Sequence, residues 1–357
     1  MRQRIGRMNF TTRIAIFLAA TCLLLASSPW LRVAACQVLS EERNQAKPAD
    51  VPTQWKGLIG EYTLGADTLC VLEREGTLCL LTKSNHLYKL SSNGNDAFAI
   101  EQDWPYDEKV CIFRKNQDGA GTSIEVGNKT YGRVFFGGEN GRSFRIRVLK
   151  PVSILRDDAM RATPPKEDGE FLPPDLVELR NLDSTLHFDI RYATTNNFVG
   201  EKFYSQARAF LQSPAADALV RVHRALRQMG YGLLIHDAYR PWYVTKMFWD
   251  ATPVEQKEFV ADPSKGSRHN RGCAVDLSLY DLNTGSAVEM ASGYDEFSHR
   301  AYPEYPGGTS LQRWHRKTLR EAMEAEGFKV FEWEWWHFDY KDWRHYPIGT
   351  TTFEMIH

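Results

Sequence analysis

The strongest constraint on the fold of this chain is a proline-rich segment that separates two regions with different hydrophobic patterns. The segment covers residues 151–174 and contains the pairs Pro164-Pro165 and Pro173-Pro174. Proline lacks a backbone donor and has a fixed φ, so such a stretch is poorly suited to helix or sheet interiors. At roughly 150 residues per domain, the chain of 357 residues has room for about two domains. We therefore predict a linker at 151–174 between two domains.

The region before this linker, residues 55–150, has the pattern of an all-β domain. Short apolar runs alternate with turns rich in Gly, Asn and Asp, and no stretch shows a helical period. This pattern predicts a small barrel or sandwich. The expected strands include Leu69–Leu72, Leu78–Leu81, Val110–Phe113 and Arg133–Phe136.

The region after the linker, residues 175–357, mixes helices and strands. Apolar residues recur at helical spacing in Ala215–Met229, and a second helix is expected at Thr309–Glu326. Leu233–Ile235 and Phe328–Phe338 have the pattern of buried strands. The second domain is therefore expected to be α+β.

The N-terminus has the features of a secretory signal peptide. Four arginines precede the uncharged run Ile14–Ala26, which as a helix would span only about 20 Å of a ~30 Å hydrocarbon core. We predict a signal peptide at 1–35, a linker at 36–54, and export of the remaining chain to the periplasm or cell envelope. The run Val33–Cys36 also fits a cleavage site that places a lipid on Cys36, and an uncleaved N-terminal anchor is the alternative.

Charge and cysteine content narrow the function classes. Lys and Arg total 44 against 45 Asp and Glu, which argues against a broad nucleic-acid-binding surface. No Cys-x-x-Cys pair is present, which argues against a zinc ribbon or a redox motif. Cys70 and Cys79 flank a predicted hairpin turn, where either a cross-strand disulfide or two buried free thiols fits the pattern.

A candidate metal site lies in the second domain. His269 precedes Asp276 by seven positions, with Gly272 allowing a turn between them, and His337 follows in a tryptophan-rich segment. Two His and one Asp leave one coordination position open, which is typical of catalytic zinc. Five other histidines are expected at the surface or in caps: His86, His187, His223, His315 and His345.

These motifs resemble the zinc D-Ala-D-Ala dipeptidases of the VanX type, within the zinc D,D-peptidases. The similarity extends over residues 176–346. It rests on Asp189–Thr194, Asp237–Pro241, His269–Asp276, Gly293–Ser298 and Glu334–His337. The resemblance implies a zinc D,D-peptidase fold, an antiparallel sheet with flanking helices. It says nothing about the β domain, whose partner is unknown.

The resemblance also implies a role for each site residue. His269, Asp276 and His337 would hold one Zn²⁺ per chain, which lowers the pKa of a bound water toward ~7. Glu334 would be the general base, and Arg240 would stabilise the oxyanion. Asp295 would receive the ammonium group of the dipeptide D-Ala-D-Ala. Ser267 and Tyr192 would line the pocket.

The strand pattern conflicts with one part of this assignment. Side chains alternate along a regular strand, so Glu334 and His337 would face opposite sides. If both reach the metal, a β-bulge or a strand end must lie between them. Cys273, inside the metal motif, is expected to be a small buried residue and not a ligand. Of the neighbouring tryptophans 333, 335 and 336, at least one is expected in the core, with Trp336 nearest the metal.

Two other functions remain open. A secreted D,D-carboxypeptidase that trims peptidoglycan stem peptides would use the same metal chemistry, and the predicted signal peptide favours it. Asp295 and the Trp335-Trp336 pair favour the dipeptidase. A non-catalytic cell-wall binding module is the third reading, but it would not need Glu334 and Arg240 together.

Overall fold

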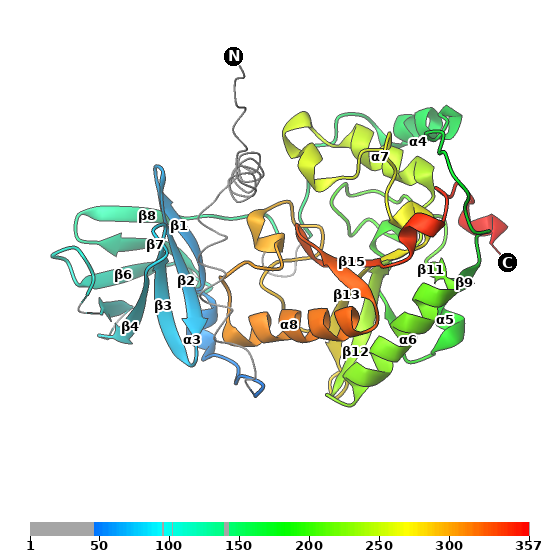
Figure 1. The fold of residues 1–357 in the computed structure, drawn as a ribbon. Coiled ribbons are helices and arrows are strands. Elements are labelled where there is room, and N and C mark those ends of the chain that lie inside the picture. The colour runs from blue at the N-terminus through cyan, green and yellow to red at the C-terminus, as the bar shows by residue number, and fades with distance from the viewer. Residues whose placement is uncertain (1–45, 95, 102, 139–142, 357) are drawn as a thin grey trace, which may run out of the picture.

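The computed structural model describes residues 46–94, 96–101, 103–138 and 143–356. These residues form a β-barrel and an α+β domain that lie next to each other (Figure 1). The predicted signal peptide, Cys36 and residues 36–45 of the first predicted linker lie outside the described residues. Within the described ranges, no helix combines the length and the apolar character needed to cross a bilayer.

The first domain is a closed barrel of eight antiparallel strands among the described residues. Each strand pairs with the next along the chain, and β8 pairs back with β1. Alternate side chains such as Tyr88 and Leu90 point into the core, as the period of two requires. The all-β prediction is confirmed, as a barrel. A short helix α3 (Thr53–Lys56) precedes the strands β1 (Gly60–Leu64), β2 (Asp67–Arg74), β3 (Thr77–Thr82), β4 (Leu87–Ser92), β5 (Ala97–Ile100), β6 (Val110–Lys115), β7 (Gly121–Val126) and β8 (Lys129–Arg133).

The last barrel strand ends earlier than predicted. β8 stops at Arg133, so the strand expected at Arg133–Phe136 is wrong except for its first residue. The Arg133 guanidinium donates to the carbonyls of Gly57 and Ile59, which ties the strand end to the chain before β1. Beyond this point the chain leaves the barrel for the second domain (Figure 1).

The two cysteines of the β2–β3 hairpin are free thiols. Cys70 pairs with Leu81 and Cys79 with Leu72, so the two sulfurs are not directly opposite each other. All four cysteines that the structure describes are free and buried. Burial raises the pKa of Cys70 to about 12 and that of Cys79 to about 11. Of the two alternatives for this hairpin, the structure has the pair of buried thiols.

The predicted linker at 151–174 contains a helix, α4 (Val152–Arg161). Leu155 and Ala159, four residues apart, are buried and form the side of α4 that faces the core. The helix packs against α7 (Trp242–Ala251) of the second domain. It fits between Pro151 at its N-cap and Pro164, so the prolines bound the helix and do not interrupt it. The extended part of the connection between the two domains is therefore shorter than the predicted linker of residues 151–174.

The second domain is built on a mixed sheet with the strand order β10-β12-β13-β15-β14 among the described residues. All pairs except β10–β12 are antiparallel, which confirms the predicted α+β domain with an antiparallel sheet. The helices α6 and α8 pack against each other and against the sheet. The strands are β10 (His187–Phe188), β12 (Tyr231–Asp237), β13 (Ala274–Asp281), β14 (Phe328–Phe331) and β15 (Glu334–Tyr340), with β9 (Leu176–Glu178) and β11 (Phe210–Gln212) in a separate two-stranded sheet.

The two long helices lie close to their predicted bounds. α6 covers Ser213–Arg227 and α8 covers Ser310–Ala325. α8 begins with a capping box, because the Thr309 hydroxyl accepts from the Gln312 amide while the Gln312 side chain accepts from the Thr309 amide. The remaining helices are α5 (Leu179–Leu182) and the 3₁₀ turns η1 (Arg191–Ala193), η2 (Val254–Phe259), η3 (His269–Arg271), η4 (His299–Ala301), η5 (Trp343–His345) and η6 (Phe353–Met355).

Two of the five histidines expected at the surface are buried. His223 of α6 accepts a hydrogen bond from the Leu233 amide on Nδ1, and its Nε2 lies 2.9 Å from the Thr185 hydroxyl. His315 of α8 places Nε2 3.1 Å from the Tyr231 hydroxyl. These two predictions were wrong, because the helical pattern does not show that an imidazole bonds to a neighbouring strand. The expectation holds for His86, His187 and His345, which are exposed.

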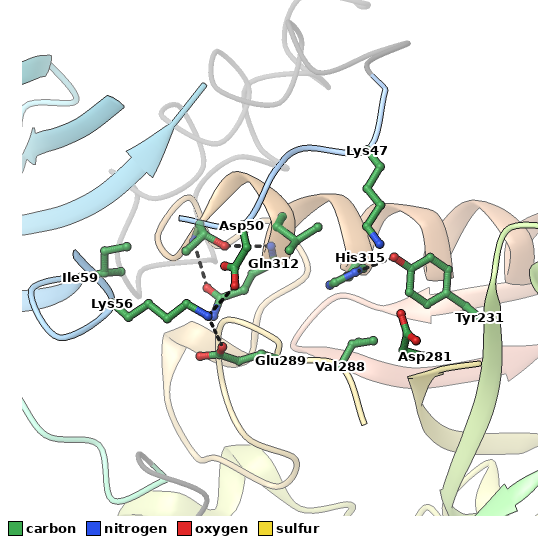
Figure 2. Close-up of a pocket in the computed structure, with 12 residues that line it drawn as sticks. Lys47, Asp50, Lys56, Ile59, Tyr231, Asp281, Val288, Glu289, Gln312 and His315 are labelled. Carbon is green, nitrogen blue, oxygen red and sulfur yellow. Dashed lines mark hydrogen bonds and ion pairs between the residues drawn. The ribbon is translucent and has the colours of Figure 1, made fainter. Parts of the chain in front are cut away.

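The segment before the barrel runs along α8 and closes a cavity of about 240 Å³ (Figure 2). Lys47 lies over the Tyr231 ring, 5.1 Å from its centre. Lys56 donates to Asp50 at 2.8 Å. Trp55 packs against the barrel core, so residues 46–56 contact both domains, and the part of the predicted first linker that is described is not detached.

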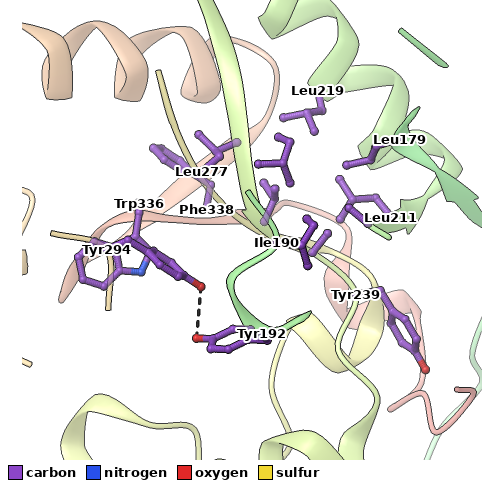
Figure 3. Close-up of a cluster of buried hydrophobic side chains, with 14 of the residues drawn as sticks. Leu179, Ile190, Tyr192, Leu211, Leu219, Tyr239, Leu277, Tyr294, Trp336 and Phe338 are labelled. Carbon is purple, nitrogen blue, oxygen red and sulfur yellow. Dashed lines mark hydrogen bonds between the residues drawn. The ribbon is translucent and has the colours of Figure 1, made fainter. Parts of the chain in front are cut away.

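The core of the second domain lies between the sheet and the helices around it. Leu219 of α6, Leu277 of β13 and Phe338 of β15 meet there, together with Ile190 (Figure 3). Toward one side this apolar core gives way to hydroxyl groups, where the Tyr294 hydroxyl donates to that of Tyr192. The polar side of the core is where the predicted site residues lie.

Candidate active site

The three predicted metal ligands come together in the structure. His269 lies in η3, Asp276 in β13, and His337 in β15 directly across the ladder from Asp276. Asp276 Oδ1 is 3.3 Å from His269 Nε2 and 3.1 Å from His337 Nδ1, and the two nitrogens are 3.1 Å apart. All three side chains are buried. They form a group that can hold one metal ion.

A turn at Gly272 directs His269 toward β13, the strand that follows it. Gly272 has a φ of 66°, in the left-handed region that favours glycine. A Cβ at this position would also lie 2.5 Å from the Leu176 side chain. The turn lets the imidazole of His269 face Asp276 although η3 lies just before β13. The turn predicted at Gly272 is confirmed.

The segment predicted as one strand, Phe328–Phe338, is a hairpin of β14 and β15. The chain turns at Glu332 and Trp333, and the register then shifts: Phe331 pairs with Glu334, whereas Val330 pairs with Phe338. The three residues 335–337 of β15 thus have no counterpart on β14. This irregularity brings Glu334 Oε2 to 3.6 Å from His337 Nδ1. The sequence required a bulge or a strand end between them, and the structure has a register shift next to Glu334, the first residue of β15.

Neighbouring groups determine which nitrogen of each imidazole faces the metal position. His269 Nδ1 lies 2.6 Å from the Ala238 carbonyl, so this nitrogen carries the proton. His337 Nε2 lies 2.9 Å from Asp339 Oδ1 and is oriented by that carboxylate. Such outer partners orient metal-binding imidazoles. Asp339 was missed in the sequence, although residues two apart on a strand share a face and His337-x-Asp339 is such a pair.

The charges around these residues suit a cation. Burial would raise the pKa of Asp276, but His269 and His337 hold it well below its usual range. Although burial favours a neutral ring, Asp339 and Asp276 raise the pKa of His337 to about 10. Among the described residues, Asp276 Oδ1 is buried without a hydrogen-bond partner. A carboxylate oxygen left unpaired between two imidazoles fits a divalent metal ion such as zinc.

Glu334 is a buried carboxyl group with a raised pKa. Burial raises the pKa of Glu334 to about 7, and His337 opposes this increase. A base with a pKa near neutrality both accepts and returns a proton easily at neutral pH.

Arg240 is held beside the metal ligands by a carboxylate. Its Nε and Nη2 donate to Asp237 Oδ2 at 3.0 and 2.8 Å, and Nη2 lies 3.7 Å from Asp276 Oδ2. The Tyr204 hydroxyl donates to the other oxygen of Asp237. Burial alone would lower the pKa of Arg240, but Asp237 raises it well above its ordinary value. No role was predicted for Asp237, although it lies in the motif that identified Arg240.

The predicted substrate residues line the same cavity as the metal ligands. The Tyr192 hydroxyl donates to both oxygens of Asp295, at 3.0 and 2.8 Å. Burial and the Asp276 carboxylate raise the pKa of Asp295 well above its ordinary value. The Tyr294 hydroxyl donates to Asp276 at 3.0 Å and so links Asp295 to the metal ligands. The Ser267 hydroxyl accepts from the His269 amide.

One cavity of about 420 Å³ joins all eight predicted site residues. Phe198, Phe248 and Phe297 line its apolar part. The volume suits a small ligand, since such cavities start near ~300 Å³. Cys273 is buried outside the lining, as predicted, and burial raises its pKa to about 12.

Comparisons with known proteins agree with this geometry. Residues 174–354 match a protein family described as Peptidase M15, D-ala-D-ala dipeptidase. The chain is 34% identical over 182 residues to a D-alanyl-D-alanine dipeptidase of Escherichia coli K12, covering 51% of this chain and 93% of that protein. The chain belongs to the M15 family of D-Ala-D-Ala dipeptidases. It is therefore an M15 metallopeptidase.

Other comparisons cover a similar share of the chain. A D-alanyl-D-alanine dipeptidase of Enterococcus faecalis V583 is 33% identical over 178 residues, or 44% of this chain and 88% of that protein. A solved structure of the LdcB LD-carboxypeptidase covers 55% of this chain and 79% of that one, with 20% identity and a TM-score of 0.29, which is too low to support an argument. The M15 match contains every predicted site residue, and the barrel lies before it.

Two tryptophans of this M15 domain pack next to the site, outside the cavity. Trp335 and Trp336 are buried and do not line the cavity. The Trp336 ring packs on Tyr294 with ring centres 5.5 Å apart, and Trp335 Nε1 donates to the Ser292 hydroxyl. Trp336 thus packs on Tyr294, the residue that bonds to the metal ligand Asp276.

Proposed function

We propose that this M15 peptidase hydrolyses the free dipeptide D-Ala-D-Ala with one zinc ion held by His269, Asp276 and His337. The observation that carries the proposal is the shared cavity, which is lined by the ligand group, by Glu334 and by the buried carboxylate of Asp295. A dipeptide carries an ammonium group on its first residue and a carboxylate on its second. A small cavity with an acidic group near the reacting centre fits such a zwitterion.

The metal would supply Lewis acidity and a water of lowered pKa. Glu334, close to His337, is placed to remove a proton from the attacking water and to pass it to the leaving amine. Arg240 offers a fixed cationic donor group for the negative charge that develops on the carbonyl oxygen.

Residues other than the three metal ligands would bind the substrate. Asp295, oriented by Tyr192, would bind the ammonium group, and the arriving cation would favour the ionised form of this buried carboxyl. Ser267 lines the same cavity beside His269 and would contact the peptide near the metal.

Two substrates test this proposal. The purified chain, with its metal content measured on the same sample, is assayed on D-Ala-D-Ala and on an N-acylated tripeptide ending in D-Ala-D-Ala. We expect hydrolysis of the free dipeptide and loss of activity with a chelator. Activity on the acylated peptide alone would refute the dipeptidase assignment, and full activity in a metal-free sample would refute the mechanism.

Two variants test the assigned roles. Glu334→Ala and Arg240→Ala should each keep the metal and lose at least about two orders of magnitude in turnover, as is typical for a lost general base or oxyanion donor. Unchanged hydrolysis in both would show that these residues are not catalytic. A non-catalytic binding module would show no hydrolysis in the wild-type protein.

A D,D-carboxypeptidase is the second candidate, and the N-terminal sequence favours it. The basic start and the apolar run Ile14–Ala26 support export to the cell envelope, where peptidoglycan stems are found. We propose this location for the chain under either activity, with Cys36 as the site of attachment if it is lipidated. Mass spectrometry of the mature N-terminus tests both points.

A further inference from the structure

The barrel contacts the part of the M15 domain that carries Asp295. We define the substrate loop as residues 293–298 and the connecting segment as residues 299–310, which leads into α8. We propose that the barrel is a positioning element for the substrate loop, and that it strengthens binding of the substrate's amino end through Glu61. This inference depends on the proposed function, because it assumes that Asp295 receives the ammonium group.

Glu61 of β1 is the centre of the first contact. Its side chain is buried, and Oε1 lies 2.7 Å from His299 Nε2 and 2.8 Å from the Tyr305 hydroxyl. Tyr305 is also buried, and its hydroxyl lies 3.9 Å from Cys70 Sγ on β2. A buried carboxylate costs free energy unless it is paired. Glu61 is therefore stable there only while the connecting segment supplies these partners.

Glu73 of β2 makes the second contact, at the other end of the connecting segment. Its Oε2 accepts from the Ser310 amide at 2.7 Å, at the first turn of α8, where a negative charge is favourable. Arg313 Nη2 donates to the Glu73 carbonyl at 2.9 Å. Two neighbouring barrel strands thus hold both ends of residues 299–310.

The substrate loop itself is packed between this segment and the chain that leaves the barrel. Glu296 is buried and bonds within the loop to Ser298 at 2.6 Å. A Cβ at Gly138, just after β8, would lie 2.6 Å from Glu296 Oε2, so the segment after β8 and the substrate loop are in close contact. The Phe136 ring meets the His299 ring edge-on, with centres 5.4 Å apart.

The backbone of Asp295 shows why the loop needs this support. Its φ is 59°, in the left-handed region that a non-glycine residue rarely adopts. Such a conformation is strained and persists only where the surroundings enforce it. If the contacts at Glu61 were lost, the loop could relax and Asp295 would move away from Tyr192.

This geometry separates substrate affinity from turnover. Glu334, Arg240 and the metal ligands lie on or beside β12, β13 and β15, not on the substrate loop. Asp295 would bind the ammonium equally in the ground state and in the transition state, and loss of such uniform binding raises KM without lowering kcat. Tyr294 of the same loop bonds to Asp276, so weaker support of the loop should raise KM more than it lowers kcat.

The test compares Glu61→Ala with Glu125→Ala in the full-length, zinc-loaded protein. Glu125 also carries a carboxylate on a barrel strand, but its partner is Arg114 on the neighbouring strand. For Glu61→Ala we expect KM for D-Ala-D-Ala to rise about 10-fold, a typical coupling between sites, with kcat within about twofold. Inhibition by N-acetyl-D-Ala-D-Ala, which lacks the ammonium, should be unchanged. Equal KM values in the two variants, or a fall in kcat at constant KM, would overturn the proposal.

A second variant covers the case in which Glu61→Ala does not fold. His299 is part of the same contact but is only partly buried, and in His299→Ala the Glu61 carboxylate keeps the Tyr305 hydroxyl as a partner. It should raise KM in the same way, and adding it to Glu61→Ala should give no further increase. Additive effects would show that the two residues do not act as a pair.

Hydrogen exchange separates this proposal from the proposed function. If the wild-type protein does not hydrolyse D-Ala-D-Ala, the proposed function fails, but the support of the loop is still measurable. Exchange in residues 293–298 should be faster in Glu61→Ala or His299→Ala than in Glu125→Ala. Equal exchange would overturn the positioning role whatever the activity.

Discussion

Replacing Asp237 with asparagine tests how Arg240 is held at the active site. Asp237 is buried and accepts two hydrogen bonds from the Arg240 guanidinium and one from Tyr204. Asparagine keeps the volume but removes the charge. With about 1.5 kcal/mol for each of the two charge-assisted bonds, the loss is about 3 kcal/mol. This agrees with the ~3–5 kcal/mol typical of a broken buried ion pair.

The same change should reduce turnover. Asp276 Oδ2 lies 3.7 Å from Arg240 Nη2, so without Asp237 the guanidinium can move toward this metal ligand. Arg240 would then no longer point at the developing oxyanion, and loss of one such donor lowers kcat by about 100-fold or more. The metal ligands themselves are unchanged, so the zinc content should stay the same.

Urea unfolding followed by tryptophan fluorescence measures the first effect, and steady-state kinetics with metal analysis measures the second. Asp250→Asn is the matched control, because Asp250 pairs with Lys246 within α7 and does not line the cavity. The control should keep wild-type kcat. If Asp237→Asn also kept wild-type kcat, then Asp237 would not position Arg240, even if stability fell.

Three further predictions concern other parts of the structure. Asp339→Asn should weaken zinc binding about 10- to 100-fold, because Asp339 orients His337; competition with a chelator measures this. Acidification should destabilise the protein between pH 6.5 and about 4, because burial lowers the pKa of His223 to about 4 and protonation would remove its bond from Leu233. The unfolded state binds the proton first, so stability falls with decreasing pH across this range and His223→Gln should flatten the dependence in urea titrations. The four described cysteines should be alkylated only after unfolding, as shown by peptide mapping.

Each of these three predictions has an outcome that contradicts it. Unchanged zinc affinity in Asp339→Asn would mean that His337 is oriented by other contacts. An equally steep acid dependence in His223→Gln would assign the proton uptake to other groups. Labelling of Cys70 or Cys273 in the native protein would contradict their burial, and failure to label after unfolding would contradict their free state.

Much of the site could be predicted from the sequence because its motifs are local. His269 and Asp276 belong to one turn and the strand that follows it. Once the family pattern had assigned both Glu334 and His337 to the metal site, side-chain alternation required a bulge or a strand end between them, and the structure has a register shift there. The hairpin that contains this register shift was not predicted. Its turn at Glu332 and Trp333 carries neither Gly nor Pro, so no turn signal marks it.

The residues that were missed interact over long sequence distances. His223 was assigned to the surface from its helix pattern, yet it accepts a hydrogen bond from Leu233 of the neighbouring strand β12. The helix α4 was hidden because prolines on both sides resembled a linker. Local sequence shows which residues alternate or repeat, but not which surface another element will cover.

The sequence by itself determined the division into a β domain and an α+β domain, and the ligand set of the M15 site. Hydrophobic period and residue chemistry are properties of the chain. Only the tertiary structure decided that Asp237 holds Arg240, that Asp339 orients His337, and that Glu61 of the barrel reaches the segment following Asp295. These contacts join residues whose pairing is fixed by the packing of whole elements. No short sequence pattern records them.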